Sequence, residues 1–131
     1  MMDIEEFVEK LNQARDLMIQ EKYKDAIKII NILKNEEKAN NDNFDYALTH
    51  QLYQLDSNCR SAFQQQVILT HLNKFLVNKK SITFKELNQE LKDKSNLIIG
   101  EAILRREIEL LILRNLLKCE LKGNQLIFSS L

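Results

Sequence analysis

The sequence predicts a mainly helical protein, in which antiparallel helices precede a smaller subdomain that ends in a β-hairpin. The chain has 131 residues, with no proline and only two glycines, Gly100 and Gly123. A loop-rich β-sandwich needs more of both at its turns, so a helical fold is favoured. Hydrophobic residues make up 44% of the chain, which is enough for a packed core.

Two helices are expected over residues 3–20 and 22–38, joined by a turn at Glu21 and Lys22. The apolar residues of each segment recur at steps of three and four, which places them on one helical face. They are Ile4, Phe7, Val8, Leu11, Ala14, Leu17 and Met18, and then Tyr23, Ala26, Ile27, Ile29, Ile30, Ile32 and Leu33. A polar break over 37–43 follows, because Asn and Asp favour turns and helix caps. This pattern predicts a repeat-like, antiparallel helical hairpin.

Residues 44–77 predict either two helices or one. The apolar residues on both sides of Asp56 are in helical phase. Asp56, Ser57 and Asn58 are suited to cap a separate helix over roughly 59–77. Neither glycine nor proline forces a break there, so one long helix is the alternative.

The second half of the chain has a more specific pattern. A short β-prone segment at 81–83 precedes an amphipathic helix over 84–91 and a polar break over 93–96. A longer helix is expected from about Ile99 or Glu101 to Leu117. Two short alternating runs around Gly123 and Asn124 then predict a hairpin with a tight turn.

The order strand, helix, helix and hairpin is that of a winged helix. The expected organisation is therefore a helical segment, residues 1–78, and a winged-helix subdomain with a small C-terminal β-hairpin, residues 79–131. We expect the two segments to form one continuous compact unit.

A linking helix over Val67–Val77 leads into a set of apolar positions in the winged helix, namely Ile82, Phe84, Leu87, Leu91, Ile108, Leu111, Ile112, Leu117, Leu121, Ile127 and Phe128. This arrangement resembles the PCI domain, named for the proteasome lid, the COP9 signalosome and translation initiation factor 3. The chain departs from that family in a longer linker between Leu91 and Ile108 and a shorter helical-repeat part. The resemblance implies a scaffold subunit that assembles through winged-helix edges and helical faces, in a family of which some members contact RNA.

The charge distribution argues against a strongly basic nucleic-acid binder. Lys plus Arg and Asp plus Glu both number 19, so the formal net charge is zero. The balance is local, since residues 81–131 hold eight basic and seven acidic side chains. A winged helix often binds DNA through its second helix, but that helix carries Glu101, Glu107 and Glu109 against Arg105, Arg106 and Arg114. Carboxylates at contact distance repel phosphates.

The helix that ends near Leu117 is apolar nearly all round, which predicts cover on two sides. We therefore expect a non-enzymatic protein-interaction scaffold or adaptor, a subunit of a multi-protein assembly that binds a protein partner or a second copy. The expected interface residues are Leu104, Ile108, Leu111, Ile112, Leu121, Leu126 and Phe128, the first four as a mixture of core and interface. The strands around 118–121 and 125–128 are candidate edges for pairing with another chain.

The alternative is a winged-helix nucleic-acid-binding protein, either a small transcription regulator or an RNA-contacting subunit. Its expected contacts are Lys79, Lys80, Arg105, Arg106, Lys118 and Lys122. A steep salt dependence of binding would identify this function.

Neither catalysis nor a bound cofactor or metal is expected. His50, His71, Cys59 and Cys119 lack the short ligand spacing of a zinc site, and the chain has no glycine-rich phosphate loop. The acidic N-terminus is unlike a signal peptide, and no apolar run approaches the ~20 residues that cross a bilayer. With two cysteines of reduced type, we expect a cytoplasmic protein, or a nuclear one if the source is a eukaryote.

Overall fold

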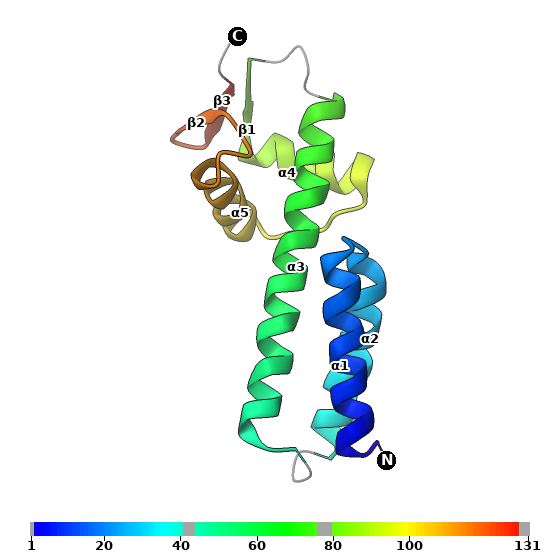
Figure 1. The fold of residues 1–131 in the computed structure, drawn as a ribbon. Coiled ribbons are helices and arrows are strands. Elements are labelled where there is room, and N and C mark those ends of the chain that lie inside the picture. Colours follow the sequence, from blue (N-terminus) through cyan, green and yellow to red (C-terminus); the bar gives the residue numbers. More distant parts are fainter. Residues whose placement is uncertain (1, 41–43, 76–79, 129–131) are drawn as a thin grey trace. The chain divides into compact units, whose positions relative to one another are not determined.

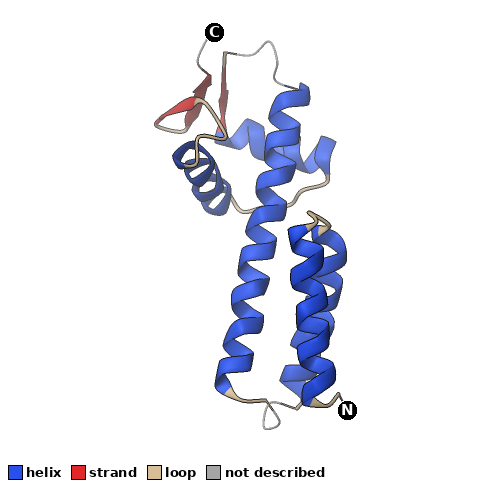
Figure 2. Cartoon of the chain, in the orientation of Figure 1, coloured by secondary structure: helices blue, strands red, loops and turns tan. Residues whose placement is uncertain are grey.

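The computed structural model describes residues 2–40, 44–75 and 80–128, which form five helices and three strands (Figures 1 and 2). The expected class, mainly helical with a small C-terminal sheet, is confirmed. The chain divides into two compact units, Met1–Phe63 and Gln64–Leu131. Their boundary lies within helix α3 (Tyr46–Phe75), and the expected division between residues 78 and 79 lies outside the described residues.

Unit 1 consists of α1 (Ile4–Ile19), α2 (Tyr23–Ala39) and the first part of α3. The α1 and α2 helices lie side by side and antiparallel (Figure 1). Their shared core holds Phe7, Leu11, Ala14, Ala26, Ile30 and Leu33, joined by Phe44, Leu52, Leu55 and Cys59. The Phe7 and Phe44 rings lie 4.4 Å apart between centroids. The helical steps of three and four therefore predicted the centre of each buried face, while Ile4, Val8 and Ile32 of the same pattern are exposed.

The α3 helix is one continuous helix over Tyr46–Phe75, so the single-helix alternative is the observed one. Asp56 lies inside this helix and caps nothing. Its carboxylate binds Lys34 of α2 and Arg60 of α3 instead. The expected helix end at 76–77 lies outside the described residues.

Three helices end at a residue in the left-handed backbone region, and none of the three is glycine. These residues are Glu21 (φ 63°) after α1, Asn96 (φ 53°) after α4 (Phe84–Ser95) and Asn115 (φ 58°) after α5 (Glu101–Leu113). At the end of α5 the Asn115 N–H donates to the Ile112 carbonyl and the Leu116 N–H to the Leu111 carbonyl. Such a cap closes a helix because it uses the last carbonyls.

These caps correct two expected helix ends. The α5 helix ends at Leu113 and not at Leu117, because Asn115 turns the chain out of the helix. The α4 helix continues to Ser95, past the expected end at 91, because the left-handed residue that stops it is Asn96. Lys92 and Lys94 lie in the last turn of α4, where their charge favours the negative end of the helix dipole.

Replacing Glu21 with glycine is expected to stabilise unit 1 by about 0.5–1 kcal/mol, because a left-handed backbone is strained for any residue with a Cβ. Glu21 is exposed, so no packing is lost. Urea unfolding followed by circular dichroism measures the change. The matched control is Gln20→Gly, at the neighbouring residue, whose φ is −79°. That change should destabilise the protein, and a stabilisation of equal size by both would contradict the cause given.

Unit 2 is a winged helix. After α3 come β1 (Ser81–Thr83), α4, α5, β2 (Cys119–Lys122) and β3 (Gln125–Phe128). The strands form an antiparallel sheet in the order β1-β3-β2, so that β3 is central. Thr83, the last residue of β1, also caps α4, since its Oγ1 accepts from the Glu86 N–H at 3.1 Å. One residue thus ends the strand and begins the helix.

The β2–β3 hairpin has the expected two-residue turn at Gly123 and Asn124. Gly123 has φ of +60°, and a positive φ at the first central position but not the second is the pattern of a type II′ turn. This turn matches the right-handed twist of the two strands. It also sets the register, in which Lys122 faces Gln125 and Cys119 faces Phe128.

Candidate protein-interaction surface

The α5 helix buries one face and exposes the opposite one. Leu104, Glu107, Ile108 and Leu111 are buried at the spacing of one helical face. The opposite side of the helix carries Ala102, Arg106, Glu109 and Leu113, all exposed. The second cover expected for this helix is therefore not formed within the described residues of unit 2.

The seven expected interface residues divide by burial. Leu104, Ile108, Leu111 and Leu126 have no exposed area and belong to the unit 2 core, with Ile82, Phe84, Leu87 and Leu91. Ile112, Leu121 and Phe128 are half-buried. A partner can contact only these last three without opening the core. The apolar pattern did not separate the inner residues of these elements from the outer ones.

Arg105 is held in place by three groups of unit 2. Its Nε donates to Glu109 at 3.2 Å, its Nη1 donates to the Gly123 carbonyl at 2.9 Å, and its guanidinium lies 5.1 Å from the centre of the Phe84 ring. The side chain thus joins α5, the hairpin turn and the start of α4. These contacts hold the β2–β3 hairpin turn against α4 and α5. They also occupy the guanidinium group, which a phosphate would need as its hydrogen-bond donor.

Arg106 is paired with a buried carboxylate. Its Nη2 lies 3.2 Å from Oε1 of Glu107, whose side chain has no exposed area. The other oxygen, Oε2, accepts from Gln65 of α3 at 2.9 Å, and the Gln65 Oε1 accepts from Arg114 at 3.2 Å. This network connects α3 and α5 within unit 2. Both arginines proposed to contact nucleic acid therefore already have carboxylate partners.

The remaining candidate contacts for nucleic acid are lysines near the small sheet. Lys80, Lys118 and Lys122 are exposed, and the Lys80 carbonyl accepts from the Phe128 N–H at 2.9 Å. Lys79 lies outside the described residues. The exposed cations of this group therefore lie at the two edge strands and not on α5.

Large apolar side chains are exposed on and directly after α5. Leu113 is 78% exposed and Leu116 is 57% exposed, and Ile103 is exposed as well. We call these three residues the α5 apolar surface. They belong to the run that predicts an all-round apolar helix, but they are not among the seven expected interface residues. A helical wheel centred on Leu104, Ile108 and Leu111 places Leu113 on the opposite side, which is the signal that would have found it.

A cavity of about 300 Å³ lies beside α4 and the linker to α5, lined by Lys85, Asn88, Gln89, Lys92, Ile98, Ile99 and Glu101. Ile98 is 82% exposed. The lining mixes two lysines with one carboxylate and two amides, so it has no strong preference for one charge.

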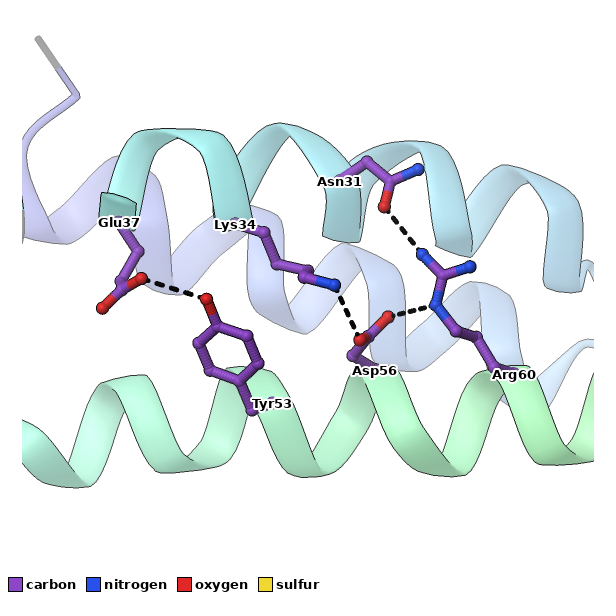
Figure 3. Close-up of polar contacts among 6 residues, drawn as sticks. All are labelled: Asn31, Lys34, Glu37, Tyr53, Asp56 and Arg60. Atoms are coloured by element: carbon purple, nitrogen blue, oxygen red, sulfur yellow. Dashed lines mark hydrogen bonds and ion pairs between the residues drawn. The ribbon is translucent and has the colours of Figure 1, made fainter. Parts of the chain in front are cut away.

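Unit 1 has a polar cluster between α2 and α3 (Figure 3). The Asp56 carboxylate lies 3.0 Å from Nζ of Lys34 and 2.7 Å from Nε of Arg60, and Arg60 also donates to Asn31. About one turn before Asp56 on α3, the Tyr53 hydroxyl donates to Glu37 at 3.1 Å. Burial alone would raise the pKa of Asp56, but the hydrogen bonds and charges of Lys34 and Arg60 outweigh it and lower the pKa.

Replacing Asp56 with asparagine is expected to destabilise unit 1 by about 1–2 kcal/mol at neutral pH, because two cations lose a charged acceptor. The folded-state pKa lies below its ordinary value of 3.8, so this stabilisation is complete above 3.8 and is lost as the pH falls through the folded value. Urea unfolding measures the free energy of unfolding of the variant and of the wild type, and the difference between them should be smaller at about pH 3 than at neutral pH. Asp16→Asn, on the exposed side of α1, is the control. A difference between Asp56→Asn and the wild type that does not depend on pH would contradict the role given to the ion pairs.

Of the four candidate residues for nucleophilic, acid–base or metal chemistry, Cys59, Cys119 and His71 are buried, and His50 is exposed on α3. Cys59 lies in the unit 1 core and Cys119 in unit 2, both free, and burial raises the pKa of each thiol. His71 is buried with its Nδ1 3.0 Å from Ser95 Oγ, and burial lowers its pKa. Among the described residues, no group of three or more His, Cys, Asp or Glu is placed to hold a metal ion.

The fold thus defines a winged-helix unit preceded by a long helix, α3, whose first part packs with α1 and α2 in unit 1. Comparisons of the chain with protein-family models, with curated proteins and with solved structures gave no match. The resemblance to the PCI domain therefore stays a prediction. In the part of the chain that the structure describes, no helix has the length and hydrophobicity to cross a membrane.

Proposed function

We propose that this protein is a non-enzymatic scaffold or adaptor that binds another protein through its winged helix, with the α5 apolar surface in the contact. The observation that supports this most is the division of α5. Its outward side carries exposed Leu113, while Arg105 and Arg106 of the same helix already have carboxylate partners. The resemblance to the PCI domain points the same way, since it implies a scaffold subunit.

A nucleic-acid contact through α5 has an energetic obstacle. Phosphates would have to compete with Glu109 for Arg105 and with Glu107 for Arg106, and both carboxylates would repel the backbone. If Arg106 moved to a phosphate, the buried carboxylate of Glu107 would lose its ion pair, which is energetically costly. A protein partner meets neither obstacle, and it removes exposed Leu113, Leu116 and Ile103 from water.

The proposal is tested by comparing proteins captured from extract of the source organism by three baits. The baits are the wild type, the double variant Leu113→Ser with Leu116→Ser, and the control Ile19→Ser. Ile19 is 79% exposed at the end of α1 in unit 1, so the control removes a comparable apolar side chain elsewhere. We expect one set of proteins to be retained by the wild type and the control and lost by the double variant. Identical sets for all three baits would contradict the proposal.

The nucleic-acid alternative is tested by fluorescence anisotropy with labelled duplex and single-stranded oligonucleotides at low salt. We expect no saturable binding. Binding that weakens steeply with salt and is lost in a variant with Lys80, Lys118 and Lys122 changed to glutamine would establish the alternative in its place.

We further propose a reducing compartment, the cytoplasm or a nucleus, supported by the two free cysteines, Cys59 and Cys119.

A further inference from the structure

The β2 strand is an edge of the unit 2 sheet. Within the described residues it pairs with β3 alone, while β3 is flanked by β1 on one side and β2 on the other. The run 125–128 is therefore no candidate edge, contrary to the expectation from sequence. β1 and β2 are the two strands with one side open to another strand.

The hairpin register determines which backbone groups β2 presents at its open side. Lys122 and Gln125 flank a two-residue turn and face each other, which makes them a hydrogen-bonded pair. Such pairs alternate along an antiparallel ladder, so Glu120 is also bonded to β3, while Leu121 and Cys119 direct their N–H and C=O groups outward. The open edge thus presents the backbone groups of Leu121 and Cys119, and of these two only Leu121 has a neighbour on each side within the strand, Glu120 and Lys122.

The side chains around Leu121 carry opposite charges. Glu120 and Lys122 are both exposed and, two residues apart, lie on the solvent face of the strand. Leu121 is half-buried and Cys119 is buried, on the face toward the unit 2 core. The strand therefore has an acidic residue, Glu120, before Leu121 and a basic residue, Lys122, after it.

We propose that β2 pairs with β2 of a second copy of this chain, antiparallel and centred on Leu121. In that register Leu121 faces Leu121 of the second copy, and each donates its outward N–H to the carbonyl of the other. Glu120 then faces Lys122 of the second copy, and Lys122 faces Glu120 of the second copy. Directly opposite cross-strand residues lie close enough for both ion pairs to stabilise the contact.

The charge pattern favours this partner over the other ways of extending the sheet. A parallel pairing in register would place Glu120 beside Glu120 and Lys122 beside Lys122, which is destabilising. Pairing of β2 with β1 of another copy would meet the uncharged segment Ser81–Thr83, and as a head-to-tail contact it would produce a ring or an open chain. The antiparallel β2 pairing satisfies both charges and closes as a two-fold dimer.

The proposed dimer does not use the α5 apolar surface, so either interaction can fail without the other. A protein that dimerises through β2 and captures no partner would keep this inference and remove the proposed function. A monomer that captures a partner through Leu113 would do the reverse.

The test is a charge exchange followed by sedimentation of the full chain over about 1 µM to 1 mM. Lys122→Glu gives two acidic residues on the strand, and Glu120→Lys gives two basic residues. Each variant alone should dimerise about tenfold or more weakly than the wild type, because both cross-strand pairs become repulsive. An equimolar mixture should regain dimers, since an acidic strand then meets a basic one. The double variant, with both changes, should dimerise as the wild type does.

The control is Lys24→Glu, the same charge reversal at an exposed residue of α2 in unit 1, which should leave dimerisation unchanged. Circular dichroism establishes that each variant is folded, and all three positions are exposed. A wild type that stays monomeric at about 1 mM overturns the proposal. So do single variants that dimerise as well as the wild type, a mixture that does not regain dimers, or an assembly that grows beyond two chains.

Discussion

Replacing Phe84 with alanine is expected to destabilise unit 2 by about 3–5 kcal/mol, because truncating a buried aromatic residue leaves a cavity in a packed core. Phe84 is 2% exposed, and it is the first residue of α4. Its ring lies beneath the Arg105 guanidinium, and its N–H donates to the Asn124 carbonyl at 2.8 Å. The change therefore opens the core and also removes the surface that holds Arg105 against the hairpin turn.

Urea unfolding measures the loss of stability, and hydrogen exchange locates it. Amides of α4, α5 and the sheet should exchange faster, while those of α1 and α2 should be little affected. Tyr46→Ala is the control, because Tyr46 is 85% exposed and its truncation should change the free energy of unfolding by no more than about 0.5 kcal/mol. A loss below about 1 kcal/mol for Phe84→Ala would show that this residue is not part of the core.

Ile108→Ala and Leu113→Ala are expected to differ by several kcal/mol, although they change apolar residues of the same helix. Ile108 has no exposed area, so its truncation should cost about 2–5 kcal/mol. Leu113 is 78% exposed, and its truncation should change the free energy of unfolding by at most about 0.5 kcal/mol. The two variants together measure the division of α5 into a buried face and an exposed face.

The same two variants separate stability from binding. Leu113→Ala should keep the fold and weaken capture of a protein partner, since only surface area is lost. Ile108→Ala should lower stability first, and any loss of capture should follow the fraction of unfolded protein. Equal destabilisation by both changes would mean that Leu113 is covered within the chain, which would remove the basis for the α5 apolar surface.

Structural elements that depend on residues close together in the sequence could be predicted from the sequence alone. The apolar spacing of α1 and α2 gave their buried faces, and Gly123 marked the hairpin turn because a left-handed residue was needed there. Thr83 followed by Glu86 is likewise a helix start that can be identified from spacing alone. In each case the partners lie within a few residues of each other.

The features that the sequence did not settle depend on partners far along the chain or on a choice among similar residues. Asp56 is suited to cap a helix, but inside α3 its carboxylate binds Arg60, one turn further on, and Lys34, 22 residues earlier, and the second partner cannot be identified from local spacing. Asn115 ends α5, but Asn31 and Asn88 lie inside helices, so an asparagine alone does not mark a helix end. Arg105 counted as one charge in the sequence, whereas its contact with the Gly123 carbonyl spans 18 residues.

The contact face of α5 is tested most directly by placing a photo-crosslinking residue, benzoylphenylalanine, at position 113 of the full chain in its own cell extract. Leu113 is exposed, so the replacement should not disturb the core. We expect a light-dependent adduct between this chain and another protein. The same residue in place of exposed Lys24 should give no such adduct. Adducts to nucleic acid alone, or the same adducts from both positions, would contradict a protein-binding role for this face of the winged helix.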